Sequence, residues 1–291
     1  MSGRTFRFAF EYAGYRLARG PIRRMPHSWA RRLGGVVGKA AYYVLGTRRR
    51  LTLANLAQAL PEYDELRRAR IARACFAHFG ATFFEVVSAA RFSPERVTQY
   101  FRIEGEEHLH AALAQDRGVF LMTGHLGAWE LAAYPLGLLL PRLEMVARPP
   151  NNPWIAEELA HLRERFNNRL IAKSGAVGRI LQAIREKAAV AMVIDSRAGA
   201  SGVQMPFLGH PAWFHTVMAV VALHRRTPIV PIFCRPEGRA GYRIVIHPPI
   251  TAEGRGEEAE TALMKRCLYL IEREIRRTPE QWMWMHDLWR Y

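Results

Sequence analysis

The sequence predicts an α/β fold: a mixed, largely parallel sheet flanked by helices and preceded by a basic amphipathic helical N-terminus. From residue 118 onward, short apolar runs alternate with longer stretches in which apolar residues recur every three or four positions. Alternating strands and helices build a sheet whose functional loops follow the carboxyl ends of the strands. With 291 residues, 49% of them apolar, the chain can bury one substantial core.

The N-terminal segment, residues 1–60, is expected to be a basic helical region that associates with membranes. Residues 1–50 contain twelve Lys or Arg and one acid, a net charge of +11 in a chain of net charge +16. Cations interleaved with large apolar residues suit a helix in the interface of an anionic bilayer, where each cation contributes about 1 kcal/mol. The cations expected to meet the membrane include Arg16, Arg19, Arg23 and Arg24.

Two other interpretations compete with the membrane surface for this positive charge. One is a face of arginines in contact with water, and the other is a nucleic-acid partner. Known nucleic-acid-binding motifs are absent from the sequence, and the basic segment is more apolar than phosphate binding requires, so we expect no nucleic acid. The most apolar stretch, 33–45, contains Lys39 and is shorter than the ~20 residues that span a bilayer. We therefore expect the segment to lie on the membrane rather than cross it.

Residues 61–291 are expected to form a single α/β domain. A helix is predicted over 66–91, where apolar residues recur every four positions until Ser93 and Pro94 stop it. Further helices are predicted over 154–166, 177–187, 217–226 and 257–277. Five short apolar runs predict strands at 119–122, 143–147, 189–194, 229–234 and 242–246.

Metal and cofactor sites are not expected. The three cysteines, Cys75, Cys234 and Cys267, are too widely spaced for a disulfide framework or a cysteine zinc site. The eleven histidines lack the metalloprotease spacing, and neither a Gly-x-Ser-x-Gly elbow nor a Walker phosphate loop is present.

The candidate catalytic residues are His125 and Glu130, which follow the apolar run ending at Met122. His125 is predicted at a strand-to-helix turn. Residues five apart on one helix point about 140° away from each other, so the two side chains meet only if His125 precedes the first helical turn. The carboxylate could then hold one ring nitrogen while the other faces a substrate, as in general-base catalysis. The alternative is a histidine that caps the helix beside a first-turn glutamate.

Five short blocks stand in a recognisable order along most of the chain. The first is His125 and Glu130, a His followed after four residues by Asp or Glu. The others are residues 147–152 (Ala-Arg-Pro-Pro-Asn-Asn), Asp195, residues 202–209 (Gly-Val-Gln-Met-Pro-Phe-Leu-Gly) and residues 278–286 (Thr-Pro-Glu-Gln-Trp-Met-Trp-Met-His). Together they resemble the bacterial lipid A late acyltransferases, the lauroyl and myristoyl transferases of the lysophospholipid acyltransferase superfamily.

The resemblance implies a glycerolipid acyltransferase-like fold and an O-acyltransferase at the cytoplasmic face of the bacterial inner membrane. It implies that His125 takes a proton from an acceptor hydroxyl while Glu130 fixes the histidine tautomer. The alkoxide would attack the thioester of an acyl carrier protein or coenzyme A, with no metal or cofactor. The implied acceptor is a lipid A precursor. The alternatives are another bacterial glycolipid, a lysophospholipid, or a non-catalytic lipid-binding protein.

Four residues of these blocks are candidate substrate-binding residues. Arg148 is either a clamp for a phosphate or a solvated cation, and Asn152 closes the same block. Asp195, at the end of a predicted strand, either orients a partner or caps the next turn. Gly209 either meets a backbone requirement in its block, which the pattern favours, or contacts a ligand.

Bulky residues mark where the chain departs from its apparent relatives. Trp213 and Phe214 stand where small residues are usual, and we expect them to narrow an acyl channel. Trp282 and Trp284 alternate with methionines, as in a half-buried strand, and either pack in the core or line a lipid path.

Overall fold

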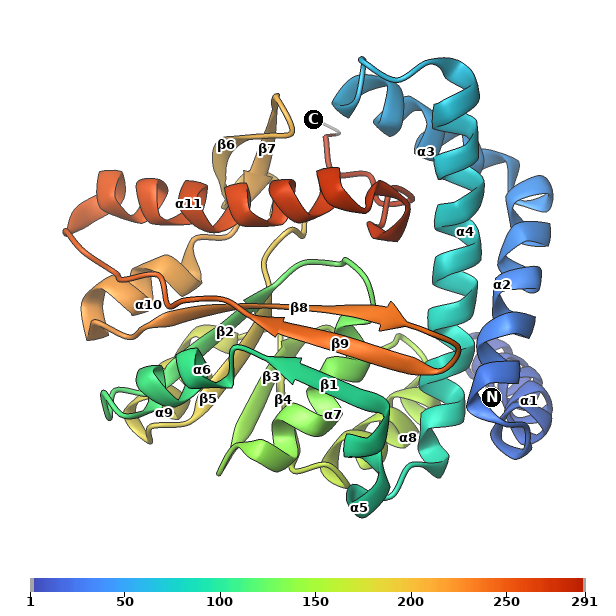
Figure 1. Ribbon diagram of the computed structural model, residues 1–291, viewed down its shortest axis with the longest axis horizontal. Helices are drawn as coiled ribbons and strands as arrows, with labels where there is room; N and C mark the ends of the chain where they lie inside the picture. The colour runs from blue at the N-terminus through green and yellow to red at the C-terminus, as the bar shows by residue number, and fades with distance from the viewer. Residues whose placement is uncertain (1–2, 290–291) are drawn as a thin grey trace.

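The structure, a computed structural model, describes residues 3–289 and confirms the α/β class (Figure 1). Its seven-stranded sheet consists of β1 (Phe101–Glu104), β2 (Val119–Thr123), β3 (Leu143–Ala147), β4 (Asn168–Ala172), β5 (Ala189–Val193), β8 (Ile229–Glu237) and β9 (Gly241–Ile246). The order is β1-β9-β8-β2-β5-β3-β4. The five consecutive strands from β8 to β4 are parallel, while β9 is antiparallel to β8 and β1 is parallel to β9. The sheet is therefore mixed and largely parallel, as predicted.

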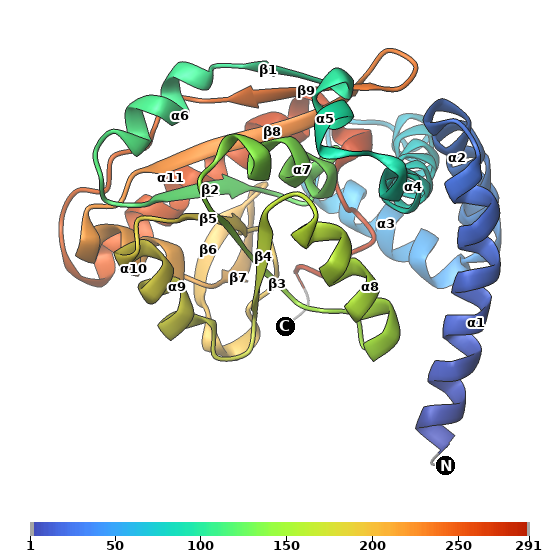
Figure 2. The ribbon, with the colours of Figure 1, turned by 90° about the horizontal axis from the view of Figure 1, so that it is seen from below.

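Helices cover both faces of the sheet (Figures 1 and 2). They are α6 (Glu106–Leu113), α7 (Trp129–Leu139), α8 (Pro153–Glu164), α9 (Ala176–Arg185), α10 (Val217–Arg225) and α11 (Gly256–Arg277). Side chains of β2 alternate between two cores, because successive residues of a strand point to opposite faces. Phe120 and Met122 pack in the core that includes α9, α10 and α11, whereas Val119 and Leu121 pack in the core that includes α6, α7 and α8.

The predicted strands and long helices are all present, but some short elements were not predicted. The edge strands β1 and β4 and the helix α6 carry too little apolar periodicity to be recognised from the sequence. A two-stranded hairpin, β6 (Val203–Phe207) and β7 (His210–Phe214), was also missed. The segment around Trp282 is irregular rather than a strand, with one isolated bridge from Trp282 to Leu126.

Four helices form a layer beside the sheet: α1 (Gly3–Arg24), α2 (His27–Val44), α3 (Gly46–Ala59) and α4 (Glu65–Ser88). Helices α2 and α4 run side by side near the carboxyl end of β8, and α1 extends beyond the body of the molecule (Figures 1 and 2). A Cβ atom at Gly34 would lie 2.5 Å from Gly80 O, and one at Gly38 would lie 2.1 Å from Phe76 O. The two helices therefore approach as closely as their glycines allow. Within residues 3–289, no helix has both the length and the hydropathy needed to cross a bilayer.

A buried polar network fastens this helical layer to the edge of the sheet. The hydroxyl of Tyr242 on β9 donates to Glu85 Oε1 at 2.6 Å and lies 2.6 Å from His27 Nε2. Arg31 pairs with Glu85 and donates to Gly241 O at 3.0 Å. Because charges and polar groups buried this deeply need their partners, the network holds α2 and α4 in a defined position against β9.

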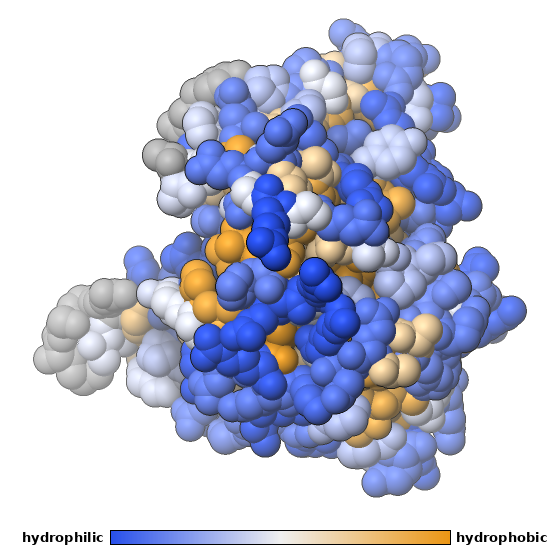
Figure 3. Space-filling model, turned by 90° about the vertical axis from the view of Figure 1, so that its left-hand side faces the viewer, coloured by the Kyte–Doolittle hydropathy of each residue, from blue (hydrophilic) through white to orange (hydrophobic). Residues whose placement is uncertain are grey.

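The side of the molecule at the left of Figure 1 is mostly hydrophilic, with small hydrophobic patches between the hydrophilic residues (Figure 3). Scattered apolar groups of this kind are usual on a protein surface.

Candidate active site

The candidate site lies where β2 and β5 are neighbours, at the carboxyl edge of the sheet. The parallel pairing places Thr123 beside Val193. Two positions further along each strand, His125 and Asp195 emerge together although 70 residues separate them. His125 Nδ1 lies 2.7 Å from Asp195 Oδ1. Because a carboxylate only accepts hydrogen bonds, Nδ1 carries the proton and Nε2 is the basic nitrogen.

Asp195 is a buried carboxylate, 1% exposed, with three hydrogen-bond donors. Besides the His125 ring, the backbone N–H of His125 and Trp282 Nε1 each donate to Oδ2 at 2.8 Å. Burial alone would raise the pKa of this carboxyl, but the His125 charge and the hydrogen bonds outweigh burial and lower the pKa below its ordinary value. A Cβ atom at Gly124 would lie 2.8 Å from Asp195 Oδ2, so this close approach requires glycine.

The pKa of His125 is raised. Burial alone would lower it, but the charge of Asp195 and its hydrogen bond outweigh burial, and the charge of Glu130 adds to the effect. Lys173 opposes the shift. Asp195 therefore both fixes the tautomer of His125 and makes Nε2 a stronger base.

The loop that carries His125 is held from three sides. The backbone N–H of Met283, in the C-terminal segment, donates to His125 O at 3.1 Å. His78 of α4 donates from Nε2 to Gly127 O at 3.1 Å, and the N–H of Ala128 donates to Cys234 O of β8 at 2.9 Å. Sheet, α4 and C-terminal segment thus fix the histidine in place.

The structure gives the His125 ring a different partner from the predicted one. Glu130, in the first turn of α7, accepts hydrogen bonds from Arg163 of α8, from Nε at 3.0 Å and from Nη2. In the described part of the chain, the Glu130 carboxylate is paired with Arg163 and the His125 ring with Asp195. Glu130 still lines the same pocket as His125 and acts on it through its charge.

Among the predicted substrate-binding residues, Arg148 lines this pocket and Asn152 does not. Arg148 follows β3, is exposed, and donates from Nη2 to Asn151 Oδ1 at 3.2 Å. Asn152 is buried at the start of α8, where its Oδ1 accepts from Trp154 N and its Nδ2 donates to Phe8 O at 2.8 Å. Asn152 thereby caps α8 and ties α1 to it.

Gly209 lies in the turn of the β6–β7 hairpin, outside the residues that line the pocket. Its φ is +83° and that of Leu208 is +49°, a pair of left-handed residues typical of a tight hairpin turn. Phe214, on the same hairpin, is fully buried against Phe207. Neither Phe214 nor Trp213 lines the pocket, so the expectation that these two aromatic residues narrow an acyl channel is not supported.

The pocket that His125 lines has a volume of about 770 Å³. One arm is apolar and lies between α7 and the strands β2 and β3, where it is lined by Leu121, Ala133, Leu136, Leu143 and Met145. The mouth is polar and cationic, with Arg148, Lys173, Arg197, His215 and His286. An apolar arm beside a histidine base suits a hydrocarbon chain attached to a reacting carbonyl.

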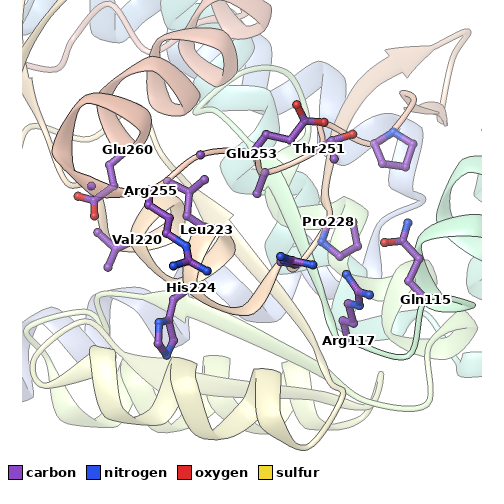
Figure 4. A pocket seen from close by; sticks show the side chains of 15 residues that line it. Gln115, Arg117, Val220, Leu223, His224, Pro228, Thr251, Glu253, Arg255 and Glu260 are labelled. Atoms are coloured by element: carbon purple, nitrogen blue, oxygen red, sulfur yellow. The ribbon is translucent and has the colours of Figure 1, made fainter.

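A second cavity of about 950 Å³ lies at the opposite edge of the sheet (Figure 4). Arg117 and Pro228, which line it, precede β2 and β8, whereas His125 follows β2. Arg255 and the carboxylates of Glu253 and Glu260 line the same cavity, so its charge is mixed. His224 also lines this cavity, but the His125–Asp195 pair lies at the carboxyl edge.

Several residues that shape the site were not predicted from the sequence, or were predicted with two alternative roles. Arg163 is a helix residue that nothing in the sequence links to Glu130, and Lys173 follows the unpredicted strand β4. Trp282 was expected in the core or on a lipid path, and it is buried and bound to Asp195. Asp195, for which two interpretations were open, accepts a hydrogen bond from the His125 ring, as a residue that orients a partner would.

Comparison with known proteins agrees with this geometry. A model of the bacterial lipid A biosynthesis acyltransferase family matches residues 7–291. The chain is 27% identical over 257 residues to the lipid A biosynthesis palmitoleoyltransferase of Escherichia coli K12, covering 87% of this chain and 82% of the relative. It is 28% identical over 266 residues to the lipid A biosynthesis lauroyltransferase of that organism, covering 90% and 85%. A phosphatidylinositol mannoside acyltransferase of Mycobacterium tuberculosis H37Rv is 24% identical over 192 residues, covering 64% and 59%. The resemblance inferred from the five sequence blocks is confirmed.

Proposed function

Because the chain belongs to the bacterial lipid A biosynthesis acyltransferase family and is an acyltransferase, we propose that it acylates a hydroxyl group of a lipid A precursor. The donor is an acyl thioester of an acyl carrier protein or of coenzyme A. The observation that carries this proposal is the His125–Asp195 hydrogen bond at the mouth of an apolar arm. It supplies a positioned base and a place for the acyl chain at one site.

The reaction is a single direct displacement. His125 Nε2 takes the proton of the acceptor hydroxyl as its oxygen attacks the thioester carbonyl, and the imidazolium that forms is stabilised by Asp195. Collapse of the tetrahedral intermediate breaks the carbon–sulfur bond and releases the thiol, which receives the proton from His125. Asp195 acts through the histidine and is a positioning residue. Glu130, predicted as the second catalytic residue, contributes negative charge near the ring while Arg163 fixes its position.

The acyl chain occupies the arm under α7. Along β3, the arm extends from Ala147 beside the mouth to the fully buried Leu143, four residue steps or about 13 Å. The lining along β3 ends at the buried, apolar Leu143, so chains that overrun it lose contact or force the core apart. Leu136 and Leu143 at this end, rather than Trp213, are the residues we propose to limit the length of the chain.

We also propose that the protein works at the cytoplasmic face of the bacterial inner membrane, with residues 1–60 against an anionic bilayer. Helix α2 supports this, because it has two apolar faces. One face, including Ala30, Gly34 and Gly38, is buried. The other face is exposed and consists of Trp29, Leu33, Val36, Val37, Tyr43 and Val44, with Trp29 at 63%, Val36 at 62% and Val44 at 80% exposure. A stripe of large, exposed apolar residues of this kind fits a bilayer interface, and within the described chain its Tyr43 side chain contacts the Tyr42 ring and accepts a hydrogen bond from Arg73.

The cations near the stripe divide into two groups. Arg19 and Arg23, which the sequence suggested would meet the membrane, pair with Glu158 of α8. Arg32 and Lys39, on α2 beside the stripe, are exposed and form no ion pair among the described residues. We therefore place the membrane contact on the outer face of α2, with Arg32 and Lys39 toward anionic headgroups.

The acceptor has one rival. The similarity to a phosphatidylinositol mannoside acyltransferase favours, as a second candidate, a hydroxyl of another glycolipid or of a lysophospholipid. Purified protein with a radiolabelled acyl-carrier thioester and a panel of acceptors separates the two. We expect labelled product with the lipid A precursor and little with phosphatidylinositol mannoside or lysophospholipid. Label confined to the other acceptors would reject the lipid A assignment, and label in none would reject the proposed function.

A further inference from the structure

Three cations stand in a row along the carboxyl edge of the sheet. Arg148 follows β3, Lys173 follows β4, and Arg197 comes four residues after β5. Neighbouring strands in the order β2-β5-β3-β4 are parallel, so the residues that follow them lie side by side, beginning with His125 after β2. Strands are spaced about 4.8 Å apart, so the row extends from the histidine to about 14 Å from it. All three cations line the pocket of His125.

These cations have no acidic partner within the described residues. The two acids whose charges raise the pKa of His125 are already engaged, Glu130 by Arg163 and Asp195 by His125 and Trp282. Among residues 3–289, no group accepts a hydrogen bond from the buried Nε atom of Arg197. A buried guanidinium nitrogen is rarely left without an acceptor, which indicates that a group absent from the protein itself supplies one.

The cations also repel one another. The pKa of Lys173 is lowered, first by burial and then by the charge of Arg148. The pKa of His215 is lowered as well, by burial and then by Lys173. A cluster of like charges costs free energy in the free protein, and an anion bound between them removes that cost.

We infer that Arg148, Lys173 and Arg197 form an anion subsite that binds a phosphate ester of a substrate while His125 acts on the hydroxyl some distance away. The inference rests on the proposed function and deepens it, because it extends the expected Arg148 clamp to two residues that the sequence did not suggest. The pattern is a row of donors at the carboxyl ends of parallel strands, where open α/β sheets bind their ligands. A phosphate on the acceptor lipid and the phosphodiester of a carrier's pantetheine arm share this chemistry.

The test uses Lys173→Gln and Arg197→Gln in the full-length protein, with Arg185→Gln as control. Arg185 is exposed on α9 outside the pocket, so its substitution changes the net charge equally. Kinetics are measured with a phosphorylated glycolipid acceptor and with the same lipid after phosphatase treatment. Each is combined with acyl-coenzyme A and with an acyl-N-acetylcysteamine thioester, which lacks phosphate.

If the phosphate belongs to the acceptor, both variants raise the KM for the phosphorylated lipid by about 10-fold to 100-fold, with kcat little changed. The KM for the phosphatase-treated lipid stays the same. If it belongs to the donor, the KM for acyl-coenzyme A rises and that for the short thioester does not. Changes no larger than those of Arg185→Gln for every substrate, or a fall in kcat alone, overturn the inference.

A measurement of binding affinity tests the anion subsite without relying on acyl transfer. Calorimetry with His125→Ala protein, alone and combined with Lys173→Gln, compares its affinity for the phosphorylated and phosphatase-treated lipids. The same measurement with coenzyme A covers the donor. We expect one phosphate-dependent affinity that Lys173→Gln weakens about 10-fold. No preference for phosphate in either ligand overturns the subsite, even if the acyl transfer assay succeeds.

Discussion

At the residue scale, Asp195 decides what His125 can do. A carboxylate that is 1% exposed and receives three hydrogen bonds stays ionised, and its charge raises the pKa of the adjacent imidazole. The same carboxylate keeps the proton on Nδ1, which leaves Nε2 as the base. Gly124 and Trp282 in turn hold the carboxylate, one by leaving room for it and the other by donating to it.

This arrangement predicts a pH effect. His125 acts as a base only when neutral, so kcat/KM rises with pH through a pKa above the ordinary 6.5. In Asp195→Asn the largest causes that raise the His125 pKa, the charge of Asp195 and its hydrogen bond, are lost, while burial still lowers the pKa, so the rising limb moves to lower pH. The plateau falls by about 10² to 10⁴-fold. The pH profiles of kcat/KM for the two proteins check this, and an unmoved midpoint would mean that Asp195 does not act on His125.

Part of this chemistry could be predicted from the residues alone. The position of His125 at a strand-to-helix turn followed from the apolar run before it and the helical pattern after it. The identity of its partner did not follow, because the pairing of His125 with Asp195 depends on β2 and β5 being neighbours. Strand order is set by how helices pack across the sheet, which local patterns do not contain. Glu130 was close in sequence, but its side chain is held by Arg163 on another helix.

At the element scale, the close pairing of α2 and α4 depends on glycines. Gly34→Ala would place a methyl group 2.5 Å from Gly80 O, so the helices must separate, at a cost of about 1 to 3 kcal/mol. Its neighbour Gly35 is the matched control, because a Cβ atom there would be 3.8 Å from the nearest atom, Ala77 O. Gly35→Ala is expected to be neutral or to stabilise by up to about 1 kcal/mol through helix propensity. Thermal or urea unfolding measures both, and equal stabilities would contradict the close packing.

The arm beneath α7 predicts donor selection. Ala133→Leu fills the arm and should shift preference toward shorter acyl donors, whereas Leu136→Ala lengthens it and should shift preference toward longer ones. Each methylene gained or lost changes the preference by about 0.8 kcal/mol. Competition between donors of increasing chain length measures the shift. Identical length profiles for both variants and the wild type would mean that the acyl chain lies elsewhere.

Elements differed in how well they could be predicted. The buried central strands are continuous apolar runs, and they were located to within a few residues. The edge strands β1 and β4 mix polar and apolar residues and are only partly buried, and they were missed. In the C-terminal block around Trp282, tryptophans and methionines alternate as the two faces of a strand would. The segment is nevertheless irregular and packs against the loop that carries His125. Tertiary contacts overrode the local pattern there.

At the scale of the whole molecule, the exposed stripe of α2 predicts how the protein meets a bilayer. Trp29→Ser combined with Val36→Ser should weaken binding to anionic vesicles by several kcal/mol, since each large apolar side chain contributes about 1.5 to 3 when buried. Tyr269→Ser is the control, because Tyr269 is 60% exposed on α11, away from the helical layer. Vesicle co-sedimentation measures binding. Equal binding by all variants would place the membrane contact elsewhere, and a change of oligomeric state would assign the stripe to a second copy of the chain.

The central claim is that His125 and Asp195 act as one unit, and a double-mutant cycle tests it most directly. The measurement is kcat/KM for acyl transfer by the wild type, His125→Ala, Asp195→Ala and the double variant. If Asp195 acts only through His125, removing Asp195 has no further effect once His125 is gone. The kcat/KM of the double variant should therefore equal that of His125→Ala, about 10² to 10⁴-fold below wild type. Losses that multiply in the double variant, or near-normal activity of His125→Ala, would contradict the account.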